Sequence, residues 1–199
     1  MRPGNALIIM ARSPEAGEVK TRLSPALDKK ERRALYSRLL DDTVNRLRAV
    51  DSAEIIMAHT PDGAGAYFRE RFGLACIEQG GGDLGQRLSR VITLVLGKGY
   101  GRVAVVGSDI PGLDAAIAED AFNALEAADV AIGPSRDGGY YLIAMSRPMP
   151  ELFRDIPWSS PETLRKTIER AEGLGLSVRT LCVLDDVDTP EDLERLGLI

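Results

Sequence analysis

Short apolar runs alternate with amphipathic segments along the whole chain, and this alternation restricts the fold more than any other feature. The apolar runs are rich in Ile, Val and Ala and span residues 6–11, 53–59, 74–79 and 102–109. Between and after them lie segments of helical period, at 29–50, 63–72, 83–99 and 113–128. Strands that alternate with helices build a mostly parallel sheet covered on both faces. The pattern predicts a three-layer α/β/α fold with the most apolar run, 102–109, near the centre of the sheet.

The alternation changes after residue 129. Residues 129–145 hold two apolar runs joined by a turn too short for a crossover helix, so neighbouring strands there should be antiparallel. A helix over 162–174, which Ser160 and Pro161 should start, a last strand over 177–187 and a terminal helix follow. No repeat, linker or low-complexity segment divides the chain. We therefore expect a mixed sheet in a single domain over residues 1–199.

Local signals predict where two of the helices begin. Asp28 and Glu31 have the spacing of a capping box before the first long helix. Thr189 can cap the terminal helix, with Pro190 at its first position and Asp192 completing a second box. Both boundaries follow from local chemistry alone.

Charge and cysteine content limit the classes of function. The formal net charge is -5 at pH 7, so general attraction to DNA, RNA or an anionic membrane is not expected. No run approaches the roughly 20 apolar residues that cross a bilayer, and the start lacks the layout of a signal peptide. Cys76 and Cys182 lie far apart inside apolar runs, which is typical of buried thiols in a reducing compartment. We therefore expect a cytoplasmic protein in which any phosphate chemistry depends on a local group of cations.

The loop after the first predicted strand concentrates positive charge. Its sequence, ARSPEAGEVKTRL, carries Arg12, Lys20 and Arg22 around Gly17. Ligands of such folds bind outside the carboxyl ends of strands, and glycine lets the backbone approach them closely. The loop is not a Walker A motif, because Val19 stands where that motif needs glycine. The three cations can neutralise a di- or triphosphate, but on composition alone a solvated basic turn is an equally good interpretation.

Two later loops place acids after strands. Asp109 follows the most apolar run, where a carboxylate can hold Mg²⁺ or Mn²⁺, although a helix cap or an ordinary turn would also explain it. We favour the functional role because site residues gather where central strands end. Asp185, Asp186 and Asp188 crowd before the terminal helix, and capping explains one of them. Because three acids in four residues repel one another unless solvent or a cation relieves them, we assign a metal role to one, Asp188.

Three further segments carry weaker signals. The pair Asp137–Gly138 is a hairpin signal between apolar runs, and Gly139 adds a second position for close backbone approach. The segment Gln79–Arg87 joins a glycine-rich turn to a helix start, which suits either a phosphate or base contact or a flexible loop. Trp158 and Ser159 are free to form a substrate wall, since the residues after them start a helix.

Six segments in a fixed order resemble the motifs of a known family. They are SPEAGEVKTRL, GDLGQRL, GSDIPGL, GPSRDGGYYLIA, PWSSPETL and DVDTPEDL. Together they look like the bacterial glycosyltransferase-like proteins of the nucleotide-diphospho-sugar transferase superfamily, and the match spans nearly the whole chain. The resemblance implies the GT-A fold. That superfamily also includes nucleotidyltransferases that make activated sugars and cofactors.

The resemblance also implies roles for individual residues. Lys20 and Arg22 would hold the nucleotide phosphates, and Asp109 would stand for the metal-binding aspartate, here in Ser-Asp rather than a full Asp-x-Asp. The segment RDGGYY is similar to a loop of the guanylyltransferases that activate phospholactate or phosphoenolpyruvate, which implies that Asp137 faces the reacting phosphates. DVDTPEDL is similar to the closing motif of sugar-activating cytidylyltransferases, which implies that Asp188 completes the metal site. The paired glycines before RMG that open nucleotidyltransferases are missing, which favours sugar transfer over nucleotide transfer.

We therefore expect a metal-dependent transferase that uses a nucleotide-diphosphate sugar as glycosyl donor, with Mg²⁺ or Mn²⁺ as cofactor. One alternative is a nucleotidyltransferase that joins GTP or CTP to a small phosphorylated acid or sugar and releases pyrophosphate. Another is a nucleotide-binding module without catalysis. The expected partners are a nucleotide or nucleotide sugar and a small-molecule acceptor, and the chain is open to forming a homodimer.

The candidate site residues fall into four groups. The catalytic candidates are Asp137, Lys20 and Arg22. The nucleotide-binding candidates are Ala11, Arg12, Gly17, Lys20, Arg22, Gln79, Gly80, Arg87 and Ser108. The acceptor-binding candidates are Gly138, Gly139, Trp158 and Ser159. The expected metal ligands are Asp109 and Asp188, from two different loops.

Overall fold

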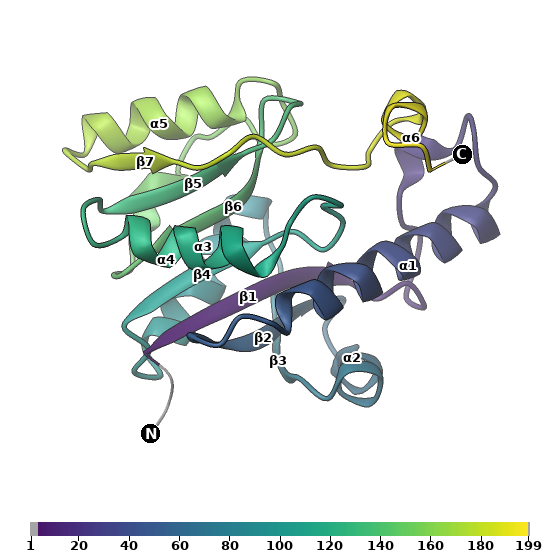
Figure 1. Ribbon diagram of the computed structural model, residues 1–199, viewed down its shortest axis with the longest axis horizontal. Coiled ribbons are helices and arrows are strands. Elements are labelled where there is room, and N and C mark those ends of the chain that lie inside the picture. Colours follow the sequence, from purple (N-terminus) through teal and green to yellow (C-terminus); the bar gives the residue numbers. More distant parts are fainter. Residues whose placement is uncertain (1–3, 199) are drawn as a thin grey trace.

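A seven-stranded sheet forms the centre of the computed structural model, which describes residues 4–198 (Figure 1). In spatial order the strands are β3 (Ala75–Glu78), β2 (Ala53–Thr60), β1 (Asn5–Arg12), β4 (Arg102–Val106), β6 (Tyr140–Met145), β5 (Val130–Pro134) and β7 (Val178–Thr180). The most apolar run supplies β4, which lies in the middle of the sheet, as predicted. β6 runs antiparallel to both β4 and β5, and the other pairs are parallel. The predicted mixed sheet is confirmed.

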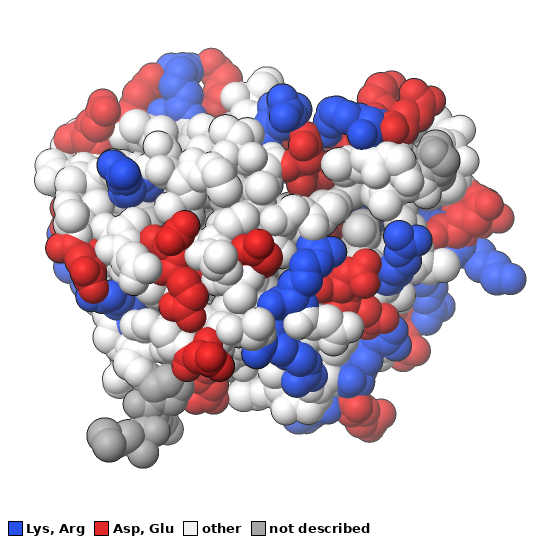
Figure 2. Space-filling view, viewed as in Figure 1, with Lys and Arg blue, Asp and Glu red and all other residues white. Residues whose placement is uncertain are grey.

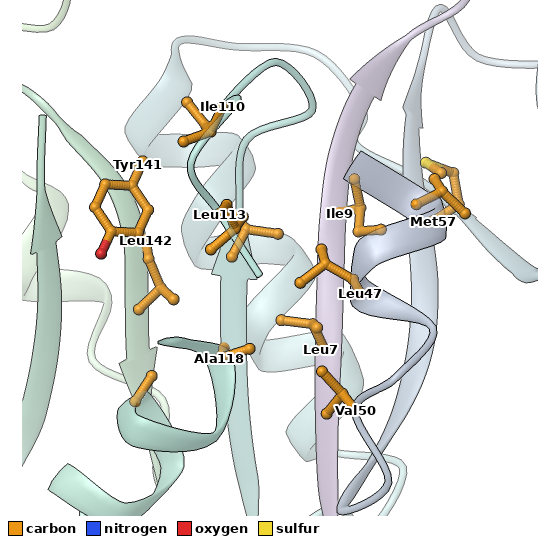
Figure 3. Packing of buried hydrophobic residues seen from close by; sticks show 14 of the residues in the cluster. Leu7, Ile9, Leu47, Val50, Met57, Ile110, Leu113, Ala118, Tyr141 and Leu142 are labelled. Carbon is orange, nitrogen blue, oxygen red and sulfur yellow. The ribbon is translucent and has the colours of Figure 1, made fainter. Parts of the chain in front are cut away.

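Helices cover both faces of this sheet. In the described part of the chain they are α1 (Lys29–Leu47), α2 (Gly65–Phe72), α3 (Leu84–Leu96), α4 (Ala115–Ala124), α5 (Thr163–Gly173) and α6 (Pro190–Arg195), with short 3-10 helices η1 (Thr21–Leu23) and η2 (Pro150–Phe153). Because side chains alternate along a strand, Leu7 and Ile9 of β1 pack with α1, α2 and α4, as part of the layer in Figure 3. Ala6 and Ile8 face the opposite side, with α3 and α5. The predicted three-layer architecture is confirmed.

Local end signals set two helix starts as predicted and a third differently. Both capping boxes are present, before α1 and before α6. The helix predicted over 162–174 is α5, Thr163–Gly173, but Ser160 and Pro161 lie in a turn before it and do not form its first turn. The reason is a turn closed by the backbone N–H of Thr163, which donates to the carbonyl of Ser160 at 3.0 Å.

The last strand is shorter than predicted. Only Val178–Thr180 pairs as a strand, after which the chain leaves the sheet toward α6 and keeps one bridge, between Ser135 and Leu184 (Figure 1). Cys182 lies in this departing segment and is exposed, so the expectation that it is buried is wrong. Cys76 is half-buried, and both thiols are free.

The surface mixes charges of both signs. Around α1, on the face shown in Figure 2, Lys and Arg side chains lie among Asp and Glu side chains. Within residues 4–198 no helix is both long enough and apolar enough to cross a bilayer. The cytoplasmic location and the single domain over 1–199 stay predictions.

Candidate active site

The candidate site is a pocket of about 560 Å³ at the carboxyl ends of β1 and β4. Its lining comes from the loops after β1 and β4, the β5–β6 turn and the residues before α5 and α6, together with Tyr36 of α1 and Leu84 of α3. Ten of the predicted residues are in its lining, namely Arg12, Lys20, Arg22, Ser108, Asp109, Asp137, Gly139, Trp158, Ser159 and Asp188. The pocket therefore lies where ligands bind in open α/β sheets.

Lys20 lies at the centre of the charged half of the pocket. Its side chain is 5% exposed, and its ammonium forms ion pairs with Asp109 and with Asp188, whose Oδ1 is 2.9 Å from Nζ. Arg22 adds a second ion pair to Asp188, at 3.2 Å. The backbone φ of Lys20 is 50°, a left-handed conformation that is uncommon outside glycine and concentrates at functional sites. The cationic loop and the two acids thus meet at one point.

The two carboxylates control the protonation of Lys20. Burial by itself would lower the pKa of the ammonium, because a buried charge loses its hydration. The negative charges of Asp109 and Asp188, and their hydrogen bonds to Nζ, outweigh that loss and hold the pKa of Lys20 above its usual range. Lys20 is therefore a cation throughout the neutral range of pH.

A small hydrophobic cluster brings the last loop to the first. We call it the satellite cluster, and its buried members are Leu23, Leu39, Val187 and Leu193, from η1, α1 and the C-terminal segment. Figure 1 shows α6 beside the segment that leads into α1, away from the sheet. The carboxylate of Asp192 fixes the turn before α6, because it accepts hydrogen bonds from the backbone N–H groups of Asp188 at 2.9 Å and Thr189 at 2.7 Å. Packing and capping together place Asp188 against Lys20.

Tyr36 of α1 joins the loop after β1 to the loop after β4, a role that sequence reasoning missed. Its hydroxyl accepts a hydrogen bond from the backbone N–H of Arg12 at 2.9 Å and shares another with Oγ of Ser108 at 3.0 Å. Burial, with a smaller effect of the Asp109 charge, raises the pKa of Tyr36 to about 12, so the hydroxyl keeps its proton. The sequence offered a weak signal, a polar-tipped aromatic residue on the buried face of a helix.

Arg46, near the other end of α1, was also missed. Its Nη1 donates to the carbonyl oxygens of Ile110 at 3.3 Å, Leu113 at 3.2 Å and Pro111. Tyr36 and Arg46 therefore contact both ends of the loop that carries Asp109. No local sequence pattern indicates this contact, since the acceptors are backbone atoms.

The chemistry of Asp109 and Asp188 fits the predicted metal role. Both carboxylates reach the same ammonium, so their oxygens face one small volume. Mg²⁺ takes oxygen ligands and is usually bound by one or two carboxylates together with substrate phosphates. Within residues 4–198, no group of three or more His, Cys, Asp or Glu side chains could hold a metal ion. A divalent ion between these two carboxylates would therefore take its further ligands from water or from substrate phosphate oxygens.

Asp137 serves the β5–β6 turn and also lines the pocket. Its Oδ1 accepts hydrogen bonds from Oγ of Ser135 at 2.5 Å and from the backbone N–H of Gly139 at 2.8 Å. One oxygen of Asp137 therefore stabilises the turn between β5 and β6, as the hairpin interpretation of the sequence expects. Its place in the pocket lining is what the predicted functional role requires.

The three acids before α6 have different surroundings. Asp185 forms ion pairs with Arg136 at 2.7 Å and Arg195 at 2.9 Å, which explains it structurally. Asp186 lines the pocket, although no role was predicted for it from the sequence. Burial first, and then the charges of Asp137 and Asp188, raise the pKa of Asp186 to about 6. The charges of the neighbouring acids thus add to the effect of burial at Asp186.

Aromatic packing builds the opposite wall. Trp158 packs edge-on against Tyr140 and beside Phe153, with ring centroids 6.1 and 6.5 Å away. Gly85 makes room for it, because a Cβ there would lie 2.7 Å from the indole ring. Ser159 follows with a φ of 58°, a second left-handed residue in the pocket lining. The predicted acceptor wall is therefore built from packed aromatic rings.

Six candidates lie outside the pocket lining: Ala11, Gly17, Gln79, Gly80, Arg87 and Gly138. Gln79 is buried, and its amide donates to the carbonyls of Ala11 at 3.2 Å and Ala58 at 2.8 Å, which ties β1 to β2. Arg87 reaches Oε1 of Gln79 at 3.4 Å. A Cβ on Gly138 would lie 2.2 Å from the carbonyl oxygen of Pro161, so this glycine permits a contact within the protein. The ligand roles of the six stay predictions.

Two comparisons of sequence identify relatives. A family profile described as "Uncharacterized protein conserved in bacteria (DUF2064)" matches residues 43–160. The 2-phospho-L-lactate guanylyltransferase of Methanothermobacter thermautotrophicus is 33% identical over 182 residues, which cover 90% of this chain and 78% of that protein. The phosphoenolpyruvate guanylyltransferase of Sphaerobacter thermophilus is 28% identical over 179 residues, which cover 89% of this chain and 86% of that protein.

A comparison of structures agrees with them. A crystal structure from Desulfovibrio desulfuricans G20, assigned as a nucleotide-diphospho-sugar transferase, has a TM-score of 0.91 and 31% identity, over 98% of this chain and 87% of that one. The fold class predicted from the sequence, and the resemblance that led to it, are confirmed.

Proposed function

The chain belongs to the bacterial family DUF2064, and from this premise we propose that it is a nucleotidyltransferase. It transfers a nucleoside monophosphate from GTP or CTP to the phosphate of a small phosphorylated acid or sugar, and it releases pyrophosphate. The two relatives named as guanylyltransferases support this alternative over the glycosyl transfer that the motifs first favoured. The absence of the paired glycines before RMG is therefore not evidence for sugar transfer in this chain.

The observation that carries the proposal is the convergence of Lys20, Asp109 and Asp188 in one pocket. A triphosphate needs cations and a divalent ion close together, and these three residues supply a buried cation beside two carboxylates. Arg12 at the end of β1 and Arg22 in the loop after it also line the pocket, so the positive charge of the pocket comes from one segment of the chain. This segment is the expected phosphate-binding side.

The reaction exchanges one phosphorus–oxygen bond for another. An oxygen of the acceptor phosphate attacks the α-phosphorus and forms the new bond, while the bond from that phosphorus to the β-bridging oxygen breaks. The electron pair of the broken bond leaves with pyrophosphate. Since the attacking phosphate oxygen is already ionised near neutral pH, the step needs no general base, and catalysis depends on positioning and on charge stabilisation.

The side chains divide this work. Lys20 and Arg22 hold phosphate oxygens and stabilise the negative charge that develops on the leaving pyrophosphate. Asp109 and Asp188 hold the divalent ion, which when bound would neutralise the triphosphate and polarise the α-phosphate. Asp137 lies at the reacting phosphates, where a role in positioning fits better than a role as base. Trp158 and Ser159 form the wall against which the acceptor lies.

The test is pyrophosphate release from GTP or CTP with Mg²⁺ and either 2-phospholactate or phosphoenolpyruvate. With α-labelled nucleotide the label should appear in the acceptor product, and with γ-labelled nucleotide it should appear in pyrophosphate. Asp109→Asn should reduce the rate by about 100-fold or more, which is the usual effect of removing one charge-stabilising group. Asp120→Asn, at an exposed position on α4, is the matched control and should leave the rate unchanged. Release of a nucleoside diphosphate from a nucleotide sugar, without pyrophosphate from either triphosphate, would contradict the proposal.

A further inference from the structure

In the free protein the ammonium of Lys20 occupies the space between the two carboxylates that we assign to the metal. It contacts both Asp109 and Asp188, and the Asp188 contact is 2.9 Å. A divalent ion that used both carboxylates would have to take this space. The ammonium and the ion therefore compete for the same oxygens.

Lys20 has little freedom to move aside into water. Its side chain is 5% exposed, whereas the side chain of Arg22, which also contacts Asp188, is 55% exposed. Arg22 can leave its carboxylate for solvent at small cost, but Lys20 would keep its charge inside the pocket. There it would lie close to the incoming ion, and like charges at short distance repel strongly where water is excluded.

If a metal ion displaces the Lys20 ammonium from Asp109 and Asp188, the ammonium needs another anionic partner near the pocket. Among the described residues the lining contains five carboxylates, of Glu18, Asp109, Asp137, Asp186 and Asp188, against three cations, Arg12, Lys20 and Arg22. Asp137 already uses one oxygen in the β5–β6 turn. A triphosphate that enters the pocket brings several new anionic oxygens, and these are suitable partners for the Lys20 ammonium.

We propose that Lys20 makes the binding of the divalent metal depend on the nucleotide. In the free protein its ammonium holds Asp109 and Asp188 together and hinders the metal. When the nucleotide enters, the ammonium passes to the triphosphate and the carboxylates are released for the ion. This inference rests on the proposed function, because it takes a triphosphate as the partner of Lys20.

The exchange has a thermodynamic consequence. If the nucleotide removes the competitor of the metal, then the nucleotide raises the affinity for the metal, and the metal raises the affinity for the nucleotide by the same factor. Part of this coupling comes from direct bonds between metal and phosphate. The part that comes from Lys20 disappears when Lys20 is replaced, and that difference is the quantity to measure.

The experiment is a titration with Mn²⁺, in which electron paramagnetic resonance measures the free ion. It is done on the full chain, alone and with the α,β-methylene analogues of GTP and CTP, which cannot release pyrophosphate. The variants are Lys20→Met and, in case that substitution disturbs folding, Lys20→Gln. Lys166→Met, at an exposed lysine on α5, is the matched control.

Without nucleotide, the Lys20 variants should bind Mn²⁺ about tenfold more tightly than the unmodified protein, within the usual range of coupling between sites. The enhancement caused by the bound analogue should shrink by the same factor. Lys166→Met should match the unmodified protein in both conditions. Equal or weaker Mn²⁺ binding by both Lys20 variants without nucleotide would overturn the inference.

The two arms separate this inference from the proposed function. The titration without nucleotide tests the competition with Lys20 and involves no nucleotide at all. The titration with the analogues tests nucleotide binding, so failure of both analogues to bind would count against the proposed function while the first arm still decides the role of Lys20.

Discussion

The hydrophobic core around the sheet (the sheet core) and the satellite cluster differ in size and in which residues of the pocket they position. The sheet core packs both faces of the sheet and fixes the end of β4, after which Ser108 and Asp109 follow. The satellite cluster holds η1 and the segment before α6, where Lys20 and Asp188 lie. One half of the pocket therefore depends on the whole fold, and the other half depends on a few side chains.

The magnitudes make this difference important. A fully buried leucine contributes about 1.5–3 kcal/mol relative to an exposed one, and the satellite cluster has only four buried members. Local opening free energies in proteins range from near zero up to the global value. We expect α6 to undock at a lower free energy than the sheet unfolds. Under the proposed function the loop with Lys20 and the segment with Asp188 both contact the metal–nucleotide complex, so binding of that complex should stabilise the satellite cluster.

The largest predicted effect compares one leucine from each group. Leu142→Ala, in the sheet core, should lower the global free energy of unfolding by about 3 kcal/mol, because it leaves a cavity among rigid neighbours. Leu193→Ala, equally buried but on α6, should lower the global value less, since its effect cannot exceed the docking free energy of α6. Denaturant unfolding gives the global values, and hydrogen exchange gives the local opening of α6.

The same pair also separates function from stability. Leu193→Ala should weaken binding of the Mn²⁺–nucleotide complex, whereas Leu142→Ala should leave that affinity unchanged at temperatures where it stays folded. If hydrogen exchange in α6 speeds up no more in Leu193→Ala than in Leu142→Ala, then the satellite cluster is part of the sheet core and the comparison fails.

A smaller effect is expected for Tyr36→Phe, which removes the hydroxyl between Arg12 and Ser108 without changing the packing. Each lost hydrogen bond contributes about 0.5–1.5 kcal/mol, so the KM for the nucleotide should rise several-fold while the fold is retained. Tyr100→Phe is the control, because its hydroxyl donates to Glu54 at 2.6 Å, near the opposite ends of the strands. A larger rise in KM for Tyr100→Phe than for Tyr36→Phe would show that the bridge does not position the two loops.

The smallest predicted effect concerns pH and Asp186. Its pKa in the folded protein is raised to about 6 from an ordinary value of 3.8, by burial and by the neighbouring acids. A carboxyl with a raised pKa gives its full stability below its unfolded pKa and loses it as pH rises through the folded pKa. In metal-free protein the melting temperature of Asp186→Asn should therefore exceed that of the unmodified protein by an amount that grows between about pH 4 and pH 6. A difference that is constant across this range would contradict the account of Asp186.

The part of the site that follows the ends of strands could be predicted from the sequence. Asp109 and the loop with Lys20 follow the two most apolar runs, and strand ends meet at one edge of a sheet, so their convergence could be expected. Asp188 was found by a different signal, the crowding of acids before a capped helix. Under the proposed function the same arrangement would account for the incomplete Asp-x-Asp motif, because Asp188, held by the satellite cluster, would supply the second carboxylate.

The contacts that were missed depend on three-dimensional neighbours. Tyr36 and Arg46 act on backbone atoms of other loops, and no spacing within a helix reveals such partners. The structural contact of Gln79 was also missed: its amide donates to carbonyls of β1 and β2, since buried polar groups need partners, and its nucleotide contact stays a prediction. Cys182 was expected inside a strand, and the chain leaves the sheet before reaching it.

The central claim is that Asp109 and Asp188 act on one metal–nucleotide centre around Lys20, and a double-mutant cycle tests it directly. The affinity of the Mn²⁺ complex of the nucleotide analogue is measured for Asp109→Asn, Asp188→Asn and the double variant. If both carboxylates serve one ion, the two losses should differ from additivity by about 1 kcal/mol or more, as for residues that share a partner. Losses that add within about 0.5 kcal/mol would mean that the two carboxylates act independently, and the shared centre would be refuted.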